Sequence, residues 1–343
     1  MRIGPTNFLL FAALLILCAA CPPPEPEGLP IGQDQTILLK ERIAHSFGDP
    51  NTRDVSFEAT MPEAALWRRI TLEYELECGR GGCDPWDRWA NLEMQIGEGD
   101  SAQYIEITRV MTPYGVGGTW ETDLTDLAPL LSGTRTFRSR IDTWVNPEGW
   151  RVTLRLHYEG GELDKRPIAV VPAFNTWVVY GDPDNPPATQ LPPAAFDVPQ
   201  DASSMRMRAF VTGHGQGNSQ NCAEFCSVEH SFNANGVEES MEIWRDDCAD
   251  NPINNQFGNW QPNRAGWCPG DIVQPILIDA GTVGPGDGSS ISWSPAEYTN
   301  TCRGAPNCDN CAFGAQTCEF NGGNHTQPRW SISAAAIFYT EHQ

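Results

Sequence analysis

Short stretches in which apolar and polar residues alternate constrain the fold of this chain more than any other feature. In the clearest, 69–76, every second residue is apolar, which is the period of a strand with one buried face. Similar runs occur at 92–96, 105–108 and 152–158, each bounded by Gly, Pro, Asn or Asp. Helical periodicity is confined to a turn at 123–131. The pattern predicts an all-β fold of the sandwich or jelly-roll type.

The length of 343 residues is enough for two such domains. A second strand-rich region begins near residue 205, after a proline-rich loop at 183–193. We therefore expect an N-terminal jelly-roll domain at 36–175 and a C-terminal jelly-roll domain at 176–343. The 28 Pro, 32 Gly and 12 Trp are typical of a loop-rich exported protein.

The N-terminus has the form of a signal peptide over 1–20, because Arg2 precedes an apolar run at 8–17. Small residues before Cys21 resemble a bacterial lipoprotein cleavage site, so Cys21 is a candidate for lipidation. Cys18 stands where such sites usually carry Leu, which leaves cleavage without a lipid open. A proline-rich tether at 21–35 follows. We expect an exported protein, either an envelope lipoprotein of the outer membrane or cell surface, or a secreted protein.

The formal charge of −22 would repel nucleic acid and anionic head groups. We therefore expect no nucleic-acid partner, and contact with a membrane only through the N-terminal lipid. In an oxidising compartment, the even number of cysteines beyond residue 21 allows up to five disulfides. These cysteines are Cys78, Cys83, Cys222, Cys226, Cys248, Cys268, Cys302, Cys308, Cys311 and Cys318.

The stretch 78–88 follows the clearest strand and concentrates reactive side chains. Cys78 and Cys83 could close a ring that contains three glycines. Two carboxylates, one of them that of Asp87, follow directly, together with an indole and a guanidinium. A braced strand end of this kind suits a catalytic carboxylate, whereas the simpler interpretation is a disulfide-pinned turn with solvated acids.

A second close cysteine pair, Cys222 and Cys226, flanks Glu224. A metal site would need further ligands at suitable spacing, which the sequence does not offer nearby. Carboxylates in different environments are typical of general acid and base catalysis. Two such loops therefore point to a catalytic pair.

The segment 251–270 combines amides, indoles and an arginine in a glycine-rich stretch. Indole faces stack on sugars, and amide and guanidinium groups bind hydroxyls, so the composition favours carbohydrate binding. The alternative is a hydrogen-bonded loop with core tryptophans. Asp142, beside Trp144 at a predicted strand end, adds another acid next to an indole.

Several of these motifs together resemble the peptide-N-glycosidase F family. They are Cys-x4-Cys-Asp-x-Trp-Asp-Arg-x-Ala-Asn at 78–91, Thr-Pro-Tyr at 112–114, Leu-Leu-Ser-Gly at 130–133, Cys-Ala-Glu-x-Cys at 222–226 and the block 251–270. The matches keep the same order and extend over roughly residues 38–340.

The resemblance implies two adjacent eight-stranded antiparallel jelly rolls with the active site in the cleft between them. It implies hydrolysis of the amide between asparagine and the innermost N-acetylglucosamine of N-glycans, which releases the glycan as a glycosylamine. Neither a cofactor nor a metal would be needed, the partners would be N-glycosylated proteins or glycopeptides, and the chain would be a monomer.

The resemblance also assigns residues. The family's essential aspartate falls on Asp87 and its second catalytic acid on Glu224. A third acid, a glutamate in the family, falls on Asp142, where the side chain is one methylene shorter. The residues that would line or border the cleft are Trp86, Arg88, Trp144, Arg264 and Trp267.

The family pattern further implies the disulfides Cys78–Cys83, Cys222–Cys226 and Cys248–Cys268. Cys302, Cys308, Cys311 and Cys318 lie in an apparent additional loop, for which we predict two more disulfides. A zinc site of four thiolates is the alternative there.

Three rival functions remain at this point. A non-catalytic N-glycan-binding surface lipoprotein would explain the shorter acid at Asp142. A copper oxygenase would need grouped histidines and a methionine ligand, whereas the six histidines of this chain are scattered. A purely structural envelope protein would leave the clustered acids and indoles unexplained.

Overall fold

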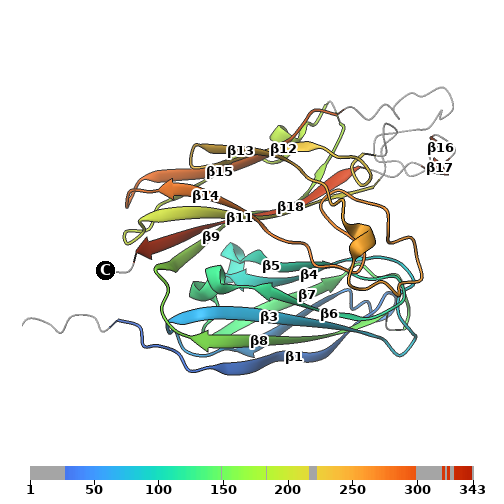
Figure 1. Cartoon of the computed structure of the whole chain (residues 1–343), viewed down its shortest axis with the longest axis horizontal. Coiled ribbons are helices and arrows are strands. Elements are labelled where there is room, and N and C mark those ends of the chain that lie inside the picture. The colour runs from blue at the N-terminus through green and yellow to red at the C-terminus, as the bar shows by residue number, and fades with distance from the viewer. Residues whose placement is uncertain are drawn as a thin grey trace, which may run out of the picture.

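The computed structural model describes residues 28–147, 149–182, 184–215, 222–298, 319–320, 323–324 and 328–341. The predicted signal peptide, Cys21 and the four cysteines from Cys302 to Cys318 lie outside these ranges. Over the described ranges the protein is all-β, as predicted, with two stacked β-sandwiches (Figure 1). None of the described helices is long and apolar enough to cross a membrane.

The first sandwich consists of two antiparallel four-stranded sheets, ordered β1-β8-β3-β6 and β2-β7-β4-β5. Its strands are β1 (Gln35–His45), β2 (Asp54–Thr60), β3 (Trp67–Cys78), β4 (Trp89–Ile96), β5 (Gln103–Met111), β6 (Gly118–Asp123), β7 (Thr134–Ile141) and β8 (Trp150–Gly160). Two short 3-10 helices, η1 (Gly99–Ser101) and η2 (Thr125–Leu130), join them.

Strand β3 shows why this sequence forms sheets. Ile70, Leu72 and Tyr74 are fully buried between the two sheets. The intervening Glu73 and Glu75 face outward and share an ion pair with Arg155 of β8. The predicted alternation over 69–76 is therefore confirmed.

The second sandwich has the sheets β14-β11-β18-β9 and β10-β15-β12-β13. Its strands are β9 (Lys165–Val179), β10 (Ala194–Asp197), β11 (Ser204–His214), β12 (Glu229–Ala234), β13 (Val237–Glu242), β14 (Ile276–Thr282), β15 (Gly288–Pro295) and β18 (Arg329–Glu341). The remaining elements are α1 (Pro187–Gln190), η3 (Cys248–Asp250), β16 (Glu319–Phe320) and β17 (Gly323–Asn324).

The chain passes from the first sandwich to the second between β8 and β9. All of β9 pairs with β18, so the expected division between residues 175 and 176 falls inside β9. Pro167 and Pro172 lie at the two register shifts of this edge strand. Proline is tolerated at bulges and sheet edges because no ladder hydrogen bond is lost there.

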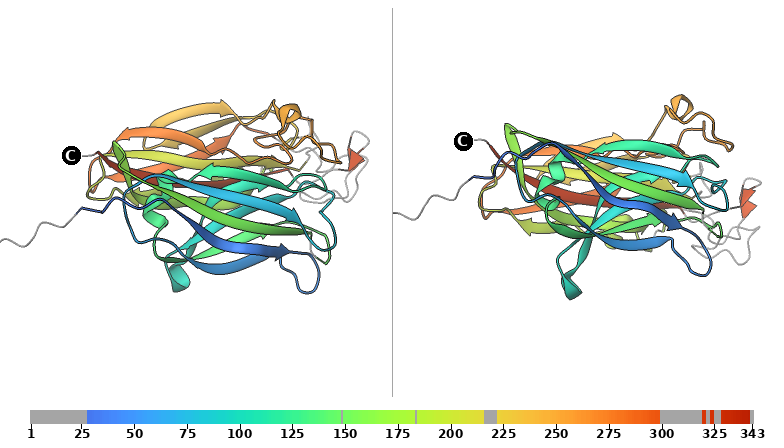
Figure 2. Two further views of the ribbon diagram at one scale, coloured as in Figure 1. Left: turned by 60° about the horizontal axis from the view of Figure 1, so that its bottom comes forward. Right: turned by 90° about the horizontal axis from the view of Figure 1, so that it is seen from below.

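The inner sheets of the two sandwiches pack face to face (Figures 1 and 2). Ala335, Ile337 and Tyr339 of β18 belong to the same apolar core as the first sandwich. A buried ion pair within β5, Glu106–Arg109, also contacts the second sandwich, since the hydroxyl of Ser333 in β18 donates to Glu106. Both apolar packing and buried polar contacts therefore set the orientation of the two halves.

Long loops from both sandwiches meet at one end of the stack, on the right in Figure 1. Backbone hydrogen bonds join loops within each sandwich, where Gly115 N donates to Asp84 O and Ala265 N donates to Glu224 O. Another backbone hydrogen bond joins the two sandwiches, from Phe257 N to Tyr114 O. The loops that carry the candidate acids therefore share one end of the molecule.

Candidate active site

The loop between β3 and β4 holds Asp87 on a braced turn. Its cysteines form the disulfide Cys78–Cys83. Asp84 is fully buried and accepts hydrogen bonds from Arg88 Nε at 2.8 Å and from the Trp86 backbone N at 3.0 Å. Asp84 is thus a structural acid that orders the residues on either side of Asp87.

The Asp84 carboxylate also accepts a hydrogen bond from Thr143 Oγ1 at 2.7 Å. Thr143 stands between Asp142 and Trp144, so this contact joins the loop after β7 to the loop of Asp87. The backbone N of Arg88 donates to Thr112 Oγ1 at 2.9 Å, which ties the loop to the end of β5 as well.

Glu224 lies on a second braced turn, closed by the disulfide Cys222–Cys226. Its backbone N donates to Gly215 O at 2.9 Å, and Gly215 N donates back to Glu224 Oε2 at 3.2 Å. The turn fixes the main chain of Glu224 but leaves one carboxylate oxygen directed to Arg264.

Arg264 lies between the two acids. Its Nη2 is 3.9 Å from Asp87 Oδ2, and its Nε is 3.6 Å from Glu224 Oε1. The arginine side chain is only 2% exposed, whereas those of Asp87 and Glu224 are 16% and 19% exposed. The structure therefore brings together Asp87, Glu224 and Arg264, with the acids on the accessible side.

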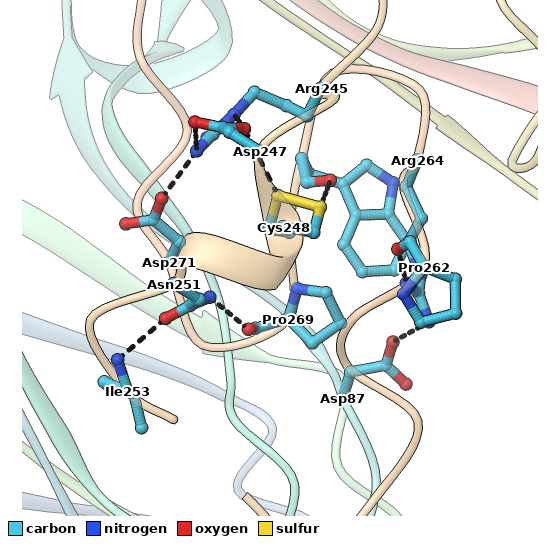
Figure 3. Close-up of a disulfide and its surroundings, with 12 residues drawn as sticks. Asp87, Arg245, Asp247, Cys248, Asn251, Ile253, Pro262, Arg264, Pro269 and Asp271 are labelled. Atoms are coloured by element: carbon cyan, nitrogen blue, oxygen red, sulfur yellow. Dashed lines mark hydrogen bonds and ion pairs between the residues drawn. A yellow bond between two sulfur atoms is a disulfide. The ribbon is translucent and has the colours of Figure 1, made fainter. Parts of the chain in front are cut away.

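The loop that carries Arg264 is held by the disulfide Cys248–Cys268 (Figure 3). Within it, Asn251 Nδ2 donates to Pro269 O at 2.7 Å. Arg264 Nη2 also donates to the carbonyl oxygen of Asn259 at 2.9 Å. All three disulfides implied by the family resemblance are confirmed.

The electrostatic environment makes the two acids unequal. Burial raises the pKa of Asp87, while Arg264 and a hydrogen bond from the Tyr114 hydroxyl oppose the increase. Burial and the negative charge of Asp87 raise the pKa of Glu224 to about 7, again against Arg264. Burial and Asp87 raise the pKa of Tyr114, so its hydroxyl remains a donor. Glu224 is therefore poised to exchange a proton near neutral pH.

Aromatic rings pack against the Arg264 guanidinium on its buried side. The Trp267 ring centroid is 5.0 Å from the guanidinium carbon, and its indole N donates to Gly213 O at 2.8 Å. His214 stacks on Trp267 at 5.3 Å, and burial holds the pKa of His214 well below its usual value. Trp267 itself is 3% exposed. It thus supports the site from the interior and offers no open face to a ligand.

Asp142 forms its ion pair with an arginine other than Arg264. Its side chain is 51% exposed and forms an ion pair with Arg53 at 3.2 Å. It borders a hollow of about 250 Å³ that is also lined by Arg53, Asp54, Trp89, Arg140, Ile141, Trp177 and Arg329. Within the described ranges, no ion pair joins Asp142 to Arg264.

The other predicted lining residues differ in exposure. Trp86 is 59% exposed and lies edge-on to Tyr114 at 6.4 Å. Trp144 is 54% exposed and packs on Arg53 and Phe47. Arg88 is 20% exposed beside Asp84. Trp86 therefore presents an open indole beside Tyr114, whose hydroxyl donates to Asp87, whereas Trp144 lies with Arg53.

Three further residues build the site without having been predicted as site residues: Asp84, Tyr114 and Gly215. Asp84 stands in the motif 78–91 beside Asp87, and Tyr114 stands in the motif 112–114, so membership of these motifs was a usable signal. Gly215 contributes through its backbone alone, and nothing in the sequence marks it.

Across the ranges that the structure describes, no three His, Cys, Asp or Glu side chains are grouped to hold an ion. The guanidinium of Arg264 occupies the position between the acids that a cation would need.

Comparisons with known proteins agree with this geometry. Residues 185–304 match the family model described as "Peptide-N-glycosidase F, C terminal". Peptide-N(4)-(N-acetyl-beta-D-glucosaminyl)asparagine amidase F of Elizabethkingia miricola is 31% identical over 265 residues, which are 72% of this chain and 73% of the relative.

Two solved structures share the fold. PNGase F from Flavobacterium meningosepticum, described as a glycosylasparaginase, aligns with a TM-score of 0.73 and 24% identity over 91% of this chain and 97% of that chain. PNGF-II aligns with a TM-score of 0.69 and 18% identity over 91% of this chain and 66% of that one.

Proposed function

This chain belongs to the peptide-N-glycosidase F family, and we propose that it hydrolyses the amide between asparagine and the innermost N-acetylglucosamine of N-glycans. Asparagine becomes aspartate, and the intact glycan leaves as a glycosylamine. The enzyme is thus an amidase that acts on a linear carbon–nitrogen bond. Its substrates are N-glycosylated proteins or glycopeptides.

One observation carries the proposal: Asp87 and Glu224, from different sandwiches, lie on either side of the buried Arg264. Hydrolysis of an amide needs a base to activate water, an acid to protonate the departing nitrogen and a positive group near the developing oxyanion. Two acids with unequal environments and one guanidinium supply these roles.

In our mechanism the Glu224 carboxylate accepts a proton from water, and the hydroxide attacks the carbonyl carbon of the glycosylated asparagine. Asp87 contacts the amide nitrogen of the linkage. The Arg264 guanidinium stabilises the negative charge of the two carboxylates and of the developing oxyanion. The proton held by Glu224 then passes to the nitrogen, the carbon–nitrogen bond breaks, and the glycosylamine leaves. The second product is an aspartate side chain.

Carbohydrate recognition falls to the exposed groups around the acids. Trp86 and Trp144 offer faces for sugar C–H surfaces, and Arg88 offers donors for hydroxyls. Asp142 would act on the sugar through the hollow that it borders with Arg53, at a distance from the bond that breaks. The alternative of a non-catalytic glycan-binding protein is not favoured, since the acid pair and its arginine are intact.

Further proposals concern the chain outside the described residues. Export with a lipid on Cys21 would tether the amidase to the bacterial envelope, and the protein would act there as a monomer. Cys302, Cys308, Cys311 and Cys318 would form two disulfides. Intact mass spectrometry of the protein purified from its membrane fraction, with metal analysis and thiol titration, tests all of these.

Incubation with a defined N-glycopeptide tests the function directly. We expect free glycan and a peptide in which aspartate replaces asparagine, with no release by Asp87→Asn. Retention of a single sugar on asparagine would identify an endoglycosidase. Binding without conversion would identify a carbohydrate-binding protein.

A further inference from the structure

Phe257 is the most exposed large apolar side chain in the part of the chain that the structure describes, at 84%. Its neighbours Gln256 and Trp260 are 8% and 7% exposed. The chain thus turns the phenylalanine ring outward between two buried side chains. A single exposed apolar residue is ordinary, whereas apolar surface that is continuous with a site marks an interaction surface, so the neighbours of Phe257 decide its meaning.

The backbone beneath Phe257 is firmly held. Phe257 N donates to Tyr114 O at 3.1 Å, and Tyr114 N donates to Gln256 Oε1 at 3.0 Å. Gln256 Nε2 donates to the carbonyl oxygens of Ile253 and Pro269, both at 2.8 Å. The exposed ring therefore stands on a fixed platform.

Glycines bring this platform against the neighbouring loop. A Cβ on Gly258 would lie 2.0 Å from Cδ1 of Tyr114, and one on Gly115 would lie 2.9 Å from the Phe257 ring. Gly115 also has a φ of +72°, which glycine adopts without strain. Tyr114 and Phe257 can lie this close only because both positions lack a side chain.

This surface is continuous with the candidate active site. The Tyr114 hydroxyl donates to Asp87, and the exposed indole of Trp86 lies edge-on to the Tyr114 ring. We name Tyr114, Gly115 and Phe257 the aromatic shelf, which Trp86 borders. The shelf begins at the reactive carboxylate and ends at the most exposed ring.

We propose that the aromatic shelf binds the polypeptide that flanks the glycosylated asparagine; this inference rests on the proposed function. The substrate carries sugar on one side of the scissile amide and polypeptide on the other. Charged side chains suited to hydroxyls gather elsewhere, with Arg53 and Asp142 beside Trp144. The outer part of the shelf presents apolar ring surface instead, which suits apolar side chains of a peptide.

The segment before Phe257 supplies a partner for the peptide backbone. Asn254 and Asn255 are exposed and directly precede the shelf. Their amides can both donate to and accept from an extended chain. The site would therefore favour substrates with apolar residues next to the glycosylated asparagine.

The test uses two glycopeptides that carry the same glycan. One is a heptapeptide with leucines next to the glycosylated asparagine. The other is a capped tripeptide that has glycine in place of leucine next to the asparagine. For Phe257→Ala we expect kcat/KM to fall roughly tenfold on the heptapeptide, through KM, because burial of a phenylalanine is lost. On the tripeptide the change should stay within about twofold, the scale of a surface substitution.

Leu277→Ala is the matched control, because Leu277 is an exposed apolar residue of β14 outside the shelf. It should alter neither substrate, and Phe257→Leu should restore part of the loss. An equal loss on both peptides, or a loss that follows glycan size at constant peptide, would overturn the proposal.

Binding to Asp87→Asn with and without Phe257→Ala repeats the comparison as Kd, without turnover. Wild-type protein that converts no glycopeptide would count against the amidase alone. A peptide-dependent loss of affinity would still support the shelf, and equal affinity for both peptides in both proteins would refute it.

Discussion

Two arginines at the junction of the sandwiches pair with carboxylates in opposite ways. Arg109 donates to both oxygens of Glu106, at 2.8 and 2.6 Å, and both side chains are almost completely buried. Arg264 stands 3.6 and 3.9 Å from its two acids, which remain partly exposed. The first arrangement is closed and complete, whereas the second leaves carboxylate oxygens available.

The surroundings sharpen this difference. Arg109 Nη1 donates to Thr212 Oγ1 at 2.9 Å and to Ser331 O at 3.0 Å, so the closed cluster joins the two sandwiches. Arg264 instead donates to the backbone carbonyl oxygens of Asn259 and Pro262 in its own loop. A buried charge whose hydrogen bonds are satisfied fixes structure, whereas loosely held acids with raised pKa values are typical of reactive sites.

The largest expected effect comes from the open cluster. Asp87→Asn should lower kcat for glycan release by about 10² to 10⁴, because it removes one of two acids while keeping the side-chain shape. The melting temperature should not fall, since Asp87 is only partly buried between Tyr114 and Arg264. A fully active Asp87→Asn enzyme would refute its role.

The closed cluster should respond in stability. Arg109→Met leaves the Glu106 carboxylate buried without its cation, and we expect unfolding to become easier by about 3 to 5 kcal/mol. Urea unfolding measures this. Arg68→Met removes an exposed ion pair with Glu159 and should cost at most about 1 kcal/mol. Equal effects of the two substitutions would show that the buried cluster is not special.

The pH profile reports on Glu224. If its carboxylate activates water, kcat/KM should rise with pH through about 7, the pKa of that group. Arg264→Met removes the charge that lowers this pKa, so the rise should move to higher pH. Arg264→Lys should retain much of the original position. An unshifted profile in Arg264→Met would contradict the assignment to Glu224.

The same shift predicts a change in stability. Because the folded pKa of Glu224 is raised from 4.5 to about 7, the folded state holds a proton that the unfolded state releases between these values. Stability from this group is present below pH 4.5 and is lost as pH rises to about 7. In Glu224→Gln the melting temperature should therefore fall less than in the wild type as pH rises from 4.5 to about 7. An equal fall in both proteins would contradict this prediction.

The smallest effect is expected at Asp142. Its carboxylate is half exposed and pairs with Arg53, so Asp142→Ala should cost at most about 1 kcal/mol of stability. We expect a several-fold rise in KM with little change in kcat. A loss of kcat as large as that of Asp87→Asn would place Asp142 at the scissile bond.

Much of the fold was accessible from the sequence because alternation encodes a strand with one buried face. The limits are equally physical. The expected division at 175/176 falls inside β9, an edge strand that accommodates Pro167 and Pro172 at its bulges. The pairing of β9 with β18 joins residues far apart in the sequence, which no local pattern encodes.

The site was predicted less completely than the fold. Asp87 and Glu224 were identified through their braced loops and through the family resemblance. The bridge by Arg264 depends on loops from both sandwiches, which no local pattern encodes. The resemblance groups Asp142 with the pair; its carboxylate forms an ion pair with Arg53, and the neighbouring Thr143 donates to Asp84.

One measurement tests the central claim most directly: conversion of a defined N-glycopeptide in water enriched in oxygen-18, followed by mass spectrometry of the peptide. If Asp87 and Glu224 direct water to the amide carbonyl, the new aspartate side chain carries the heavy oxygen, and Asp87→Asn leaves the peptide unlabelled. A peptide that keeps an unlabelled asparagine while sugar is released by the wild-type protein would contradict the account.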